Sequence, residues 1–324
     1  MPIMTARGPL PASEAGYTLS HEHVLSDLWK MLRTYDAILD DEELAIQELA
    51  SYKVSGGSTL VDLTCGGMGR NPEALRRISE ATGVHIILGA GWYRQEVYPH
   101  AIYEKDTNSL ASIVIEELTA GIDGADVRAG VIGEIGTGRG GITPAEERVF
   151  RACARAQRET GAAIVTHTTH FGELAREQIA LLREEGVLPD RMMISHLGDR
   201  IDPRPLLAIA REGVYLSVDN IGYRGHGYPD DTVRAVNICC LIAEGHLDQL
   251  LLGGDVCMKS HLAAYGGKGY AHVQLRFLPM LRSRGVSEEA IYQITVANPA
   301  RLLDVPESPR ALTSPEDWLT QRRA

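Results

Sequence analysis

The pattern of apolar and polar positions predicts alternating strands and helices. Short apolar segments recur along the chain, and each is followed by a longer amphipathic segment. Apolar runs bounded by glycine or polar residues are typical of strands buried on both faces of a parallel sheet. The eight segments are 17–24, 58–65, 85–93, 129–136, 162–168, 192–197, 214–219 and 250–255.

The intervening segments carry helix start and stop signals. Thr143 and Glu146 have the spacing of a capping box, with a proline at the first helical position between them, and Gly161 follows as a stop signal. Segment 40–57 also begins with acidic residues and ends with glycine, and segment 229–245 has the same pattern after its initial proline. We therefore expect helices between the strands.

Eight strands alternating with helices over 324 residues predict the α/β class and a single (β/α)8 TIM barrel. The barrel is expected to be one domain, 1–324, in which the polar, proline-bearing residues 306–324 form a surface tail. A doubly wound open sheet is the alternative. It is disfavoured because no G-x-G-x-x-G sequence opens a helix after the first strand.

Composition narrows the class of partner. The net charge is −11 and lysine and arginine form no block, which argues against nucleic acid or an anionic membrane and leaves a small-molecule substrate. No apolar run is long enough to cross a membrane, and the N-terminal segment lacks the apolar core of a secretion signal. The five cysteines are odd in number and form no C-x-x-C pair, so we expect reduced thiols and a cytoplasmic location.

Side chains that can bind a metal ion lie at the ends of the predicted strands, which is where TIM barrels place their chemistry. Residues two apart on a strand share a face, so Ile132 is expected to share a face with Glu134, and Val165 with His167. The six candidate ligands are His21, His23, Glu134, His167, His196 and Asp255.

Imidazole and carboxylate ligands suit Zn²⁺, and also Mn²⁺, Co²⁺ or Fe²⁺. Four histidines and two carboxylates are too many for one catalytic ion that keeps an open position. They match two divalent ions that share a bridging carboxylate and a bridging hydroxide. Two cations lower the pKa of bound water, so the hydroxide exists near neutral pH and is the expected nucleophile.

The chain resembles the phosphotriesterase family of the amidohydrolase superfamily. The matching pieces are TLSHEHV, AGVIGEIGTG, IVTHT, ISHLGD, GGD and YGGKGYAH, in this order along almost the whole chain. The resemblance implies that His21, His23 and Asp255 bind a buried ion. It also implies that His167 and His196 bind a more exposed ion, that Asp255 takes the proton of the attacking hydroxide, and that the protein is a homodimer.

One position departs from the best-known members of that family, in which a carbamylated lysine bridges the ions. Segment 128–140 contains no lysine. The resemblance to the phosphotriesterase-related and homology-protein branch implies that Glu134 bridges instead. A glutamate offers the same two oxygens without a requirement for CO₂.

Substrate contacts are expected from the loops. Tyr93, after the third strand, is a candidate for polarising a carbonyl or lining the pocket, and Lys259, just beyond Asp255, is a candidate for binding an anionic group. Arg70 and Asn71 are weaker candidates after the second strand. The loop after the seventh strand contains Tyr223, Arg224, His226 and Tyr228, which the sequence does not rank.

The expected function is a binuclear metal-dependent hydrolase acting on an ester, lactone or amide, with organophosphate hydrolysis as an incidental activity. In the lactonase branch of the family an arginine follows the aspartate of the seventh strand, whereas this chain has Asn220, which disfavours acyl-homoserine lactones. Two alternatives remain open. One is a non-catalytic binding protein on the same barrel, and the other is a deaminase of the same superfamily using one metal.

Overall fold

The computed structural model describes residues 2–169, 171–225 and 227–305. The expected surface tail, 306–324, lies outside the described residues. So do His226 of the seventh-strand loop and His170.

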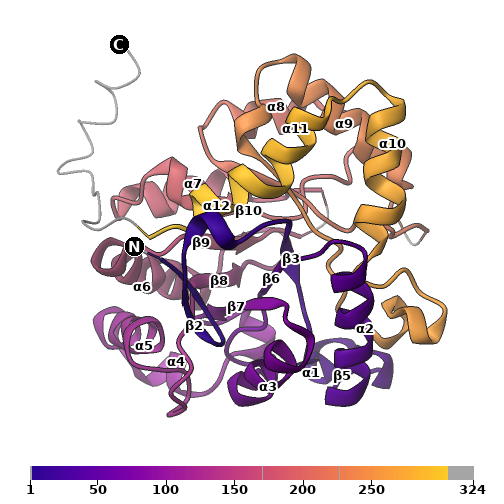
Figure 1. Ribbon diagram of the computed structural model, residues 1–324. Coiled ribbons are helices and arrows are strands. Elements are labelled where there is room, and N and C mark those ends of the chain that lie inside the picture. The colour runs from indigo at the N-terminus through magenta and orange to yellow at the C-terminus, as the bar shows by residue number, and fades with distance from the viewer. Residues whose placement is uncertain (1, 170, 226, 306–324) are drawn as a thin grey trace.

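An eight-stranded parallel sheet forms the centre of the molecule (Figure 1). Neighbouring strands follow the order β3, β6, β7, β8, β9, β10, β11, β12, and β12 lies beside β3, so the sheet closes into a barrel. The TIM barrel and all eight predicted strands are therefore confirmed. The strands are β3 Thr18–Glu22, β6 Thr59–Asp62, β7 His85–Ala90, β8 Val131–Gly136, β9 Ile164–His167, β10 Met192–Ile194, β11 Tyr215–Val218 and β12 Leu250–Leu252.

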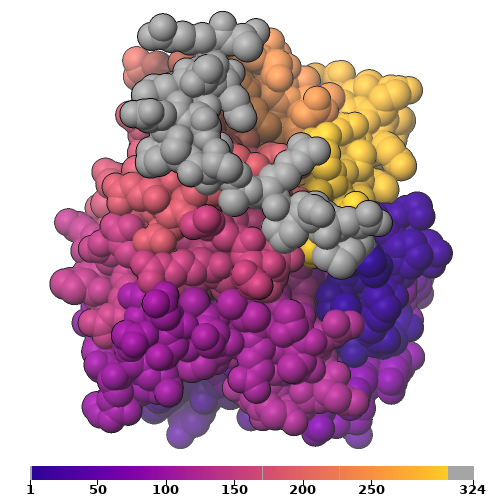
Figure 2. Space-filling view, turned by 90° about the vertical axis from the view of Figure 1, so that its left-hand side faces the viewer, coloured from indigo at the N-terminus to yellow at the C-terminus, as the bar shows by residue number. Residues whose placement is uncertain are grey.

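Helices surround the barrel, and Figure 2 shows the side covered by the part of the chain that contains α5 and α6. The predicted capping box is present, because Thr143 accepts from the backbone of Glu146 and Glu146 accepts from that of Thr143. The α-helices are α1 Trp29–Leu32, α2 Glu42–Val54, α3 Pro72–Thr82, α4 Ala101–Glu104, α5 Thr107–Thr119, α6 Pro144–Thr160, α7 Ala175–Glu184, α8 Arg204–Ala210, α9 Asp231–Ala243, α10 Leu278–Ser283, α11 Glu288–Tyr292 and α12 Asn298–Leu303. None of the helices in the described residues is long and apolar enough to cross a membrane.

The alternation of side chains along the strands separates two apolar cores. One cluster lies inside the barrel and includes Val131, Val165 and Leu251, whereas the other packs the outer strand faces against the helices. The expected pairing of Val165 with His167 agrees with this division. The pairing of Ile132 with Glu134 is wrong, because Ile132 belongs to the outer cluster and the register of β8 shifts after it, which brings Glu134 to the inner side.

We call the end of the barrel at which the parallel strands begin the lower end, and the end at which they finish the upper end. The lower end is closed by segments that the sequence pattern does not predict. A short hairpin, β1 Ile3–Thr5 and β2 Gly8–Leu10, packs Ile3 and Leu10 into the inner cluster together with Leu302 and Leu303 of α12. A second short pair, β4 Ser26–Asp27 and β5 Ile38–Leu39, lies in the loop after β3. Strands this short carry too little alternation to be recognised. With the lower end closed, the upper end is left for a site.

Candidate metal centre

The first group of candidate ligands converges on two carboxylates at the upper end of β3. His23 Nε2 lies 3.3 Å from Glu134 Oε1 and 3.4 Å from Asp255 Oδ1. His21 Nε2 lies 3.5 Å from Glu134 Oε2 and 3.6 Å from the same Asp255 oxygen. The four side chains come from the ends of β3, β8 and β12, which are distant in sequence and adjacent in the barrel.

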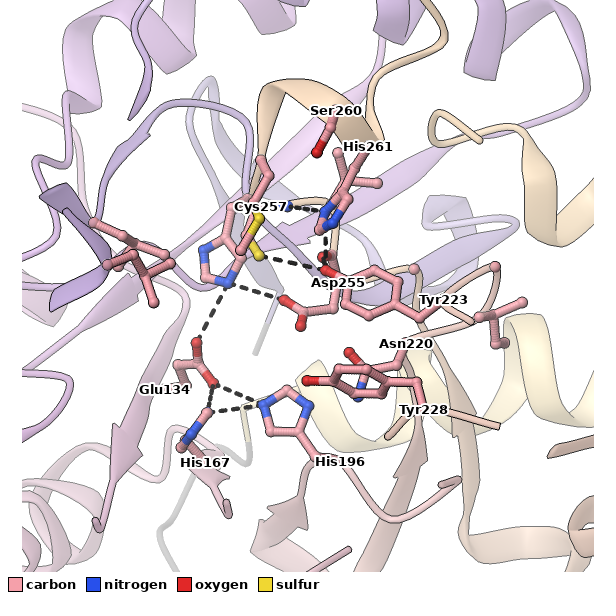
Figure 3. A pocket seen from close by; sticks show the side chains of 18 of the residues that line it. Glu134, His167, His196, Asn220, Tyr223, Tyr228, Asp255, Cys257, Ser260 and His261 are labelled. Carbon is pink, nitrogen blue, oxygen red and sulfur yellow. Dashed lines mark hydrogen bonds and ion pairs between the residues drawn. The ribbon is translucent and has the colours of Figure 1, made fainter. Parts of the chain in front are cut away.

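The second group shares Glu134. His167 Nδ1 lies 3.1 Å from Glu134 Oε2, and His196 Nε2 lies 3.6 Å from that oxygen. The two imidazole nitrogens are 2.8 Å apart, so both point at one spot (Figure 3). The structure thus brings all six predicted ligands together, and Glu134 contacts histidines of both groups.

These separations fit a pair of metal ions. Ligands bound tetrahedrally at 2.0–2.1 Å lie about 3.4 Å from one another, close to the distances in the first group. His21 Nε2 is buried and has no hydrogen-bond partner among the described residues, although its position faces both carboxylates. No lysine or arginine in that part of the chain pairs with Glu134 or Asp255, yet buried carboxylates require a cation. The donor set therefore fits two divalent cations.

Partners behind the ligands aim the imidazoles. Nδ1 of His21 lies 3.0 Å from the Ser195 hydroxyl, and Nδ1 of His23 lies 2.9 Å from the Thr64 hydroxyl. When Nδ1 is engaged in this way, Nε2 keeps its lone pair for an ion. Sequence reasoning missed both hydroxyl residues, since serine and threonine are too common in strands to signal such a role.

Asp219 is the most important of the missed partners. Its Oδ1 lies 2.8 Å from His196 Nδ1, its carboxylate also accepts the His196 backbone N–H, and its Oδ2 lies 3.4 Å from His21 Nδ1. It therefore orients one histidine from each group. A signal was available, because Asp219 ends the apolar segment 214–219, at the same rim as the ligands.

The electrostatics of the site favour cations. Burial lowers the pKa of His167 to about 4, against the attraction of Glu134, so its imidazole is neutral at pH 7 with a free lone pair. Burial by itself would raise the pKa of Glu134, but His21 and His167 outweigh it and hold that pKa well below the usual range. Burial also opposes charge on His23, yet Asp255 and Glu134 raise its pKa to about 10, which shows a strong local demand for positive charge.

The path of the chain after β12 places Asp255. A Cβ on Gly253 would lie 2.6 Å from the backbone oxygen of His21, so only glycine lets the two strands approach this closely. Glu22, between the two histidines, accepts from the backbone N–H groups of Gly254 and Val256 on either side of Asp255. No pattern in the sequence predicts this role for Glu22.

Three site residues adopt left-handed backbone conformations at the ends of successive strands. The φ angles are 62° at His196, 58° at Asn220 and 50° at Asp255. Residues other than glycine rarely occupy this region, and such backbone strain gathers at functional sites. All three side chains line the cavity described next.

A cavity of about 900 Å³ opens above the ligands (Figure 3). Tyr93 lines it, and the Tyr93 hydroxyl lies 3.2 Å from His167 Nδ1, so this predicted residue joins the site. Lys259 does not line the cavity, and its Nζ lies 3.4 Å from Asp40. Lys268, nine positions further along, lines the cavity instead.

The weaker loop candidates also divide into residues that line the cavity and residues that do not. Arg70 pairs with Glu117 and Asp123, and Asn71 caps α3, so neither lines the cavity. From the seventh-strand loop, the described residues Tyr223, Arg224 and Tyr228 all line it. The Tyr223 hydroxyl lies 3.0 Å from His261 Nδ1 and also donates to the backbone oxygen of Asp255.

The fold and the ligand geometry define a class: a TIM-barrel protein with a histidine–carboxylate centre at the upper ends of the strands, beneath a ligand-sized cavity. The model of the phosphotriesterase family matches residues 1–303, so the chain belongs to the phosphotriesterase family. The resemblance inferred from the motifs is therefore confirmed.

Relatives of known name cover nearly the whole chain. The phosphotriesterase homology protein of Escherichia coli (strain K12) is 35% identical over 288 residues, which are 88% of this chain and 97% of that protein. The N-acetyltaurine hydrolase of Danio rerio is 31% identical over 340 residues, covering 93% of this chain and 97% of that protein.

Solved structures agree. The Escherichia coli homology protein, crystallised with phosphate in its active site, superposes with a TM-score of 0.86 at 33% identity, covering 90% of this chain and 99% of that chain. A lactonase from Listeria monocytogenes gives a TM-score of 0.88 at 29% identity, covering 95% and 100%. The family and these named relatives make this protein a hydrolase.

Proposed function

We propose that this protein is a binuclear metal-dependent hydrolase of a carbonyl substrate, an ester, a lactone or an amide. The observation that carries the proposal is that Glu134 belongs to both groups of ligands, one oxygen lying 3.3 Å from His23 and the other 3.1 Å from His167. A carboxylate in this position fits a bridge between two cations. Two cations would also supply the positive charge that this cluster of four histidines and two carboxylates demands.

When bound, two divalent ions supply a nucleophilic hydroxide near neutral pH and polarise the substrate's carbonyl oxygen. Asp255 belongs to the first ligand group and also lines the cavity, so its carboxylate takes the proton from the attacking water and delivers it to the leaving group. Tyr93 directs its hydroxyl toward the same spot and is suited to donate a hydrogen bond to the carbonyl oxygen.

The relatives support a carbonyl rather than a phosphoryl substrate. One is named for the hydrolysis of an amide, N-acetyltaurine, and another is a lactonase. Organophosphate hydrolysis is documented for neighbours from Deinococcus radiodurans. One of the neighbouring structures is described as a weak promiscuous lactonase that was engineered for this activity. We therefore assign organophosphates to incidental chemistry here.

The charge at the cavity mouth favours an anionic group on the substrate. Arg139, Arg224 and Lys268 line the cavity, are exposed, and have no carboxylate partner in the described part of the chain. Arginines elsewhere on this acidic protein are commonly paired, as Arg77 is with Glu42. Three unpaired cations around one cavity provide a binding site for a carboxylate, sulfonate or phosphate.

The decisive experiment measures metal content and turnover together. Elemental analysis of the purified protein should find two ions per chain, and Glu134→Ala should lose at least one of them without rescue by bicarbonate. Glu96→Ala is the matched control, because Glu96 also lines the cavity but pairs with Arg94.

Each outcome decides between the alternatives. Two ions together with turnover of a carbonyl substrate support the proposal. One ion per chain favours a deaminase, and two ions without turnover of any ester, lactone or amide favour a binding protein. Full metal content in Glu134→Ala contradicts the bridging role.

A further inference from the structure

Asn220 lines the cavity and holds a buried acceptor that has no partner in the described part of the chain. The residue is 2% exposed, its Nδ2 donates to Asp199 Oδ2 at 2.7 Å, and its Oδ1 has no hydrogen-bond partner among the described residues. Among the described residues, no other side-chain acceptor that lines this cavity is both buried and unpartnered. Leaving such an acceptor unpaired is costly, so its retention calls for an explanation.

Neighbouring charges fix the orientation of this amide. Burial raises the pKa of Asp199, but the fully buried Arg234 donates twice to its Oδ1, at 2.9 and 2.6 Å, and this ion pair favours the carboxylate form, which only accepts. The Asn220 NH₂ group must therefore face Asp199, and its oxygen must face away. The left-handed backbone at Asn220 is one that asparagine tolerates better than most residues.

The Asn220 side chain lines the same cavity as Asp255, the group that handles the proton. Asn220 follows β11 and Asp255 follows β12, the adjacent strand, and Tyr228 lines the cavity together with them (Figure 3). A leaving group that takes a proton from Asp255 is therefore within the region that Asn220 faces.

We propose that Asn220 Oδ1 accepts a hydrogen bond from the N–H of a secondary amide, and that this contact selects amides over esters and lactones. The inference rests on the proposed function, because it names the substrate class of that site. An ester or lactone places an oxygen without hydrogen opposite Oδ1, so the acceptor stays unpaired and two oxygens face each other. Sites built to bind a donor reject analogues that lack it.

The chemical step balances without a further reactant. Water adds its oxygen to the carbonyl carbon, the C–N bond breaks, and the leaving nitrogen gains one proton by way of Asp255. The products are a carboxylic acid and an amine. The original N–H keeps its hydrogen bond to Asn220 Oδ1 throughout the reaction. The nitrogen lone pair is therefore free to face Asp255.

The test compares three substrates that differ at one atom: a secondary acetamide, its N-methyl counterpart and the acetate ester. Each is prepared with a sulfonate, carboxylate or phosphate tail, as in N-acetyltaurine, N-acetyl-N-methyltaurine and O-acetyl isethionate. For the wild-type protein we expect kcat/KM to fall at least a hundredfold from the secondary amide to the N-methyl amide. This comparison needs no variant and is unaffected by folding.

Two substitutions then isolate the acceptor. Asn220→Gly tolerates the left-handed backbone and removes the oxygen, so kcat/KM for the amide should fall ten- to a hundredfold while that for the ester changes little. Asn220→Asp is the matched control, because one carboxyl oxygen still faces the cavity while the other shares a proton with Asp199. It should retain most of the preference for the amide.

The possible results distinguish failure of the role inferred for Asn220 from failure of the proposed hydrolase function. An equal loss for amide and ester in Asn220→Gly, or no loss, overturns the role of Asn220. A wild-type protein that cleaves only esters or lactones also overturns it and leaves the hydrolase assignment intact. Failure to cleave any substrate of the set or any lactone with two ions bound removes both.

Discussion

The floor and the wall of the cavity follow different rules. The floor is the cluster of six ligands, each near or just after the end of a barrel strand. Neighbours orient some of them, as Thr64 orients His23 and Asp219 orients His196. The wall consists mainly of the loops after β11 and β12, segments 219–230 and 253–272, and other strand-end loops add residues such as Glu96 and Arg139. Strand register decides where a floor residue points, whereas the path of a loop decides where a wall residue points.

The two lysines after β12 illustrate the difference. Lys259 is closer to Asp255 in sequence and was therefore the predicted anion ligand, but it pairs with Asp40 and lies outside the cavity lining. Lys268 lines the cavity from the far side of the same loop. Proximity in sequence is a sound guide on a strand and a poor one in a loop.

Removing the metal ions should have the largest effect, and it should act on the floor alone. Chelation by dipicolinate, followed by dialysis, is expected to abolish turnover and to lower the melting temperature by roughly 5–10 °C, because ions bound to the folded state stabilise it by about 4 kcal/mol at a thousandfold excess over Kd. Differential scanning calorimetry with and without restored Zn²⁺ or Mn²⁺ checks this. Equal melting temperatures for the two forms would contradict a buried metal cluster.

Substitution of Asp219, which orients two histidines of the floor, should have the next largest effect. Asp219→Ala removes the acceptor behind His196 and His21, so metal affinity should fall about 10- to 100-fold. Titration of the metal-free protein with Zn²⁺ measures the change. Asp219→Asn keeps an acceptor for His196 Nδ1 and should lose less, and an alanine variant with unchanged affinity would show that Asp219 serves only the fold.

Much of the floor could be predicted because its ligands lie near the ends of strands that the apolar pattern identifies. Short apolar runs identified the strands, and the residues that follow them in a parallel barrel must share one rim, so His167 and Asp255 were expected together. Glu134 does point into the site, as predicted, but not for the predicted reason. The shift of register in β8 turns it inward, and alternation alone would have placed it with Ile132.

The wall resisted prediction because its contacts join positions far apart in sequence. Asn220 is fixed by Asp199, which is fixed in turn by Arg234, and none of these pairings leaves a spacing signal. The hairpin beneath the barrel was missed for a related reason, since two strands of three residues show no usable alternation.

Tyr93 lies where floor and wall meet and should give an intermediate effect. Tyr93→Phe keeps the ring and removes the hydroxyl that lies 3.2 Å from His167 Nδ1. One hydrogen bond to a developing charge stabilises it by about 1.5 kcal/mol, so kcat should fall roughly tenfold with little change in KM. Steady-state kinetics at saturating metal decide this, and a rise in KM alone would assign Tyr93 to substrate packing instead.

The smallest effect, and the sharpest comparison, is expected within the wall. Lys268→Ala should raise KM for an anionic substrate about fivefold, because an exposed charge pair contributes about 1 kcal/mol, and kcat should not change. Lys259→Ala is its matched control and should leave KM unchanged, since the ammonium group of Lys259 is engaged by Asp40. Raising the salt concentration should reduce the Lys268 effect by screening. The reverse result, with Lys259 controlling KM, would mean that the loop after β12 takes another path when substrate binds.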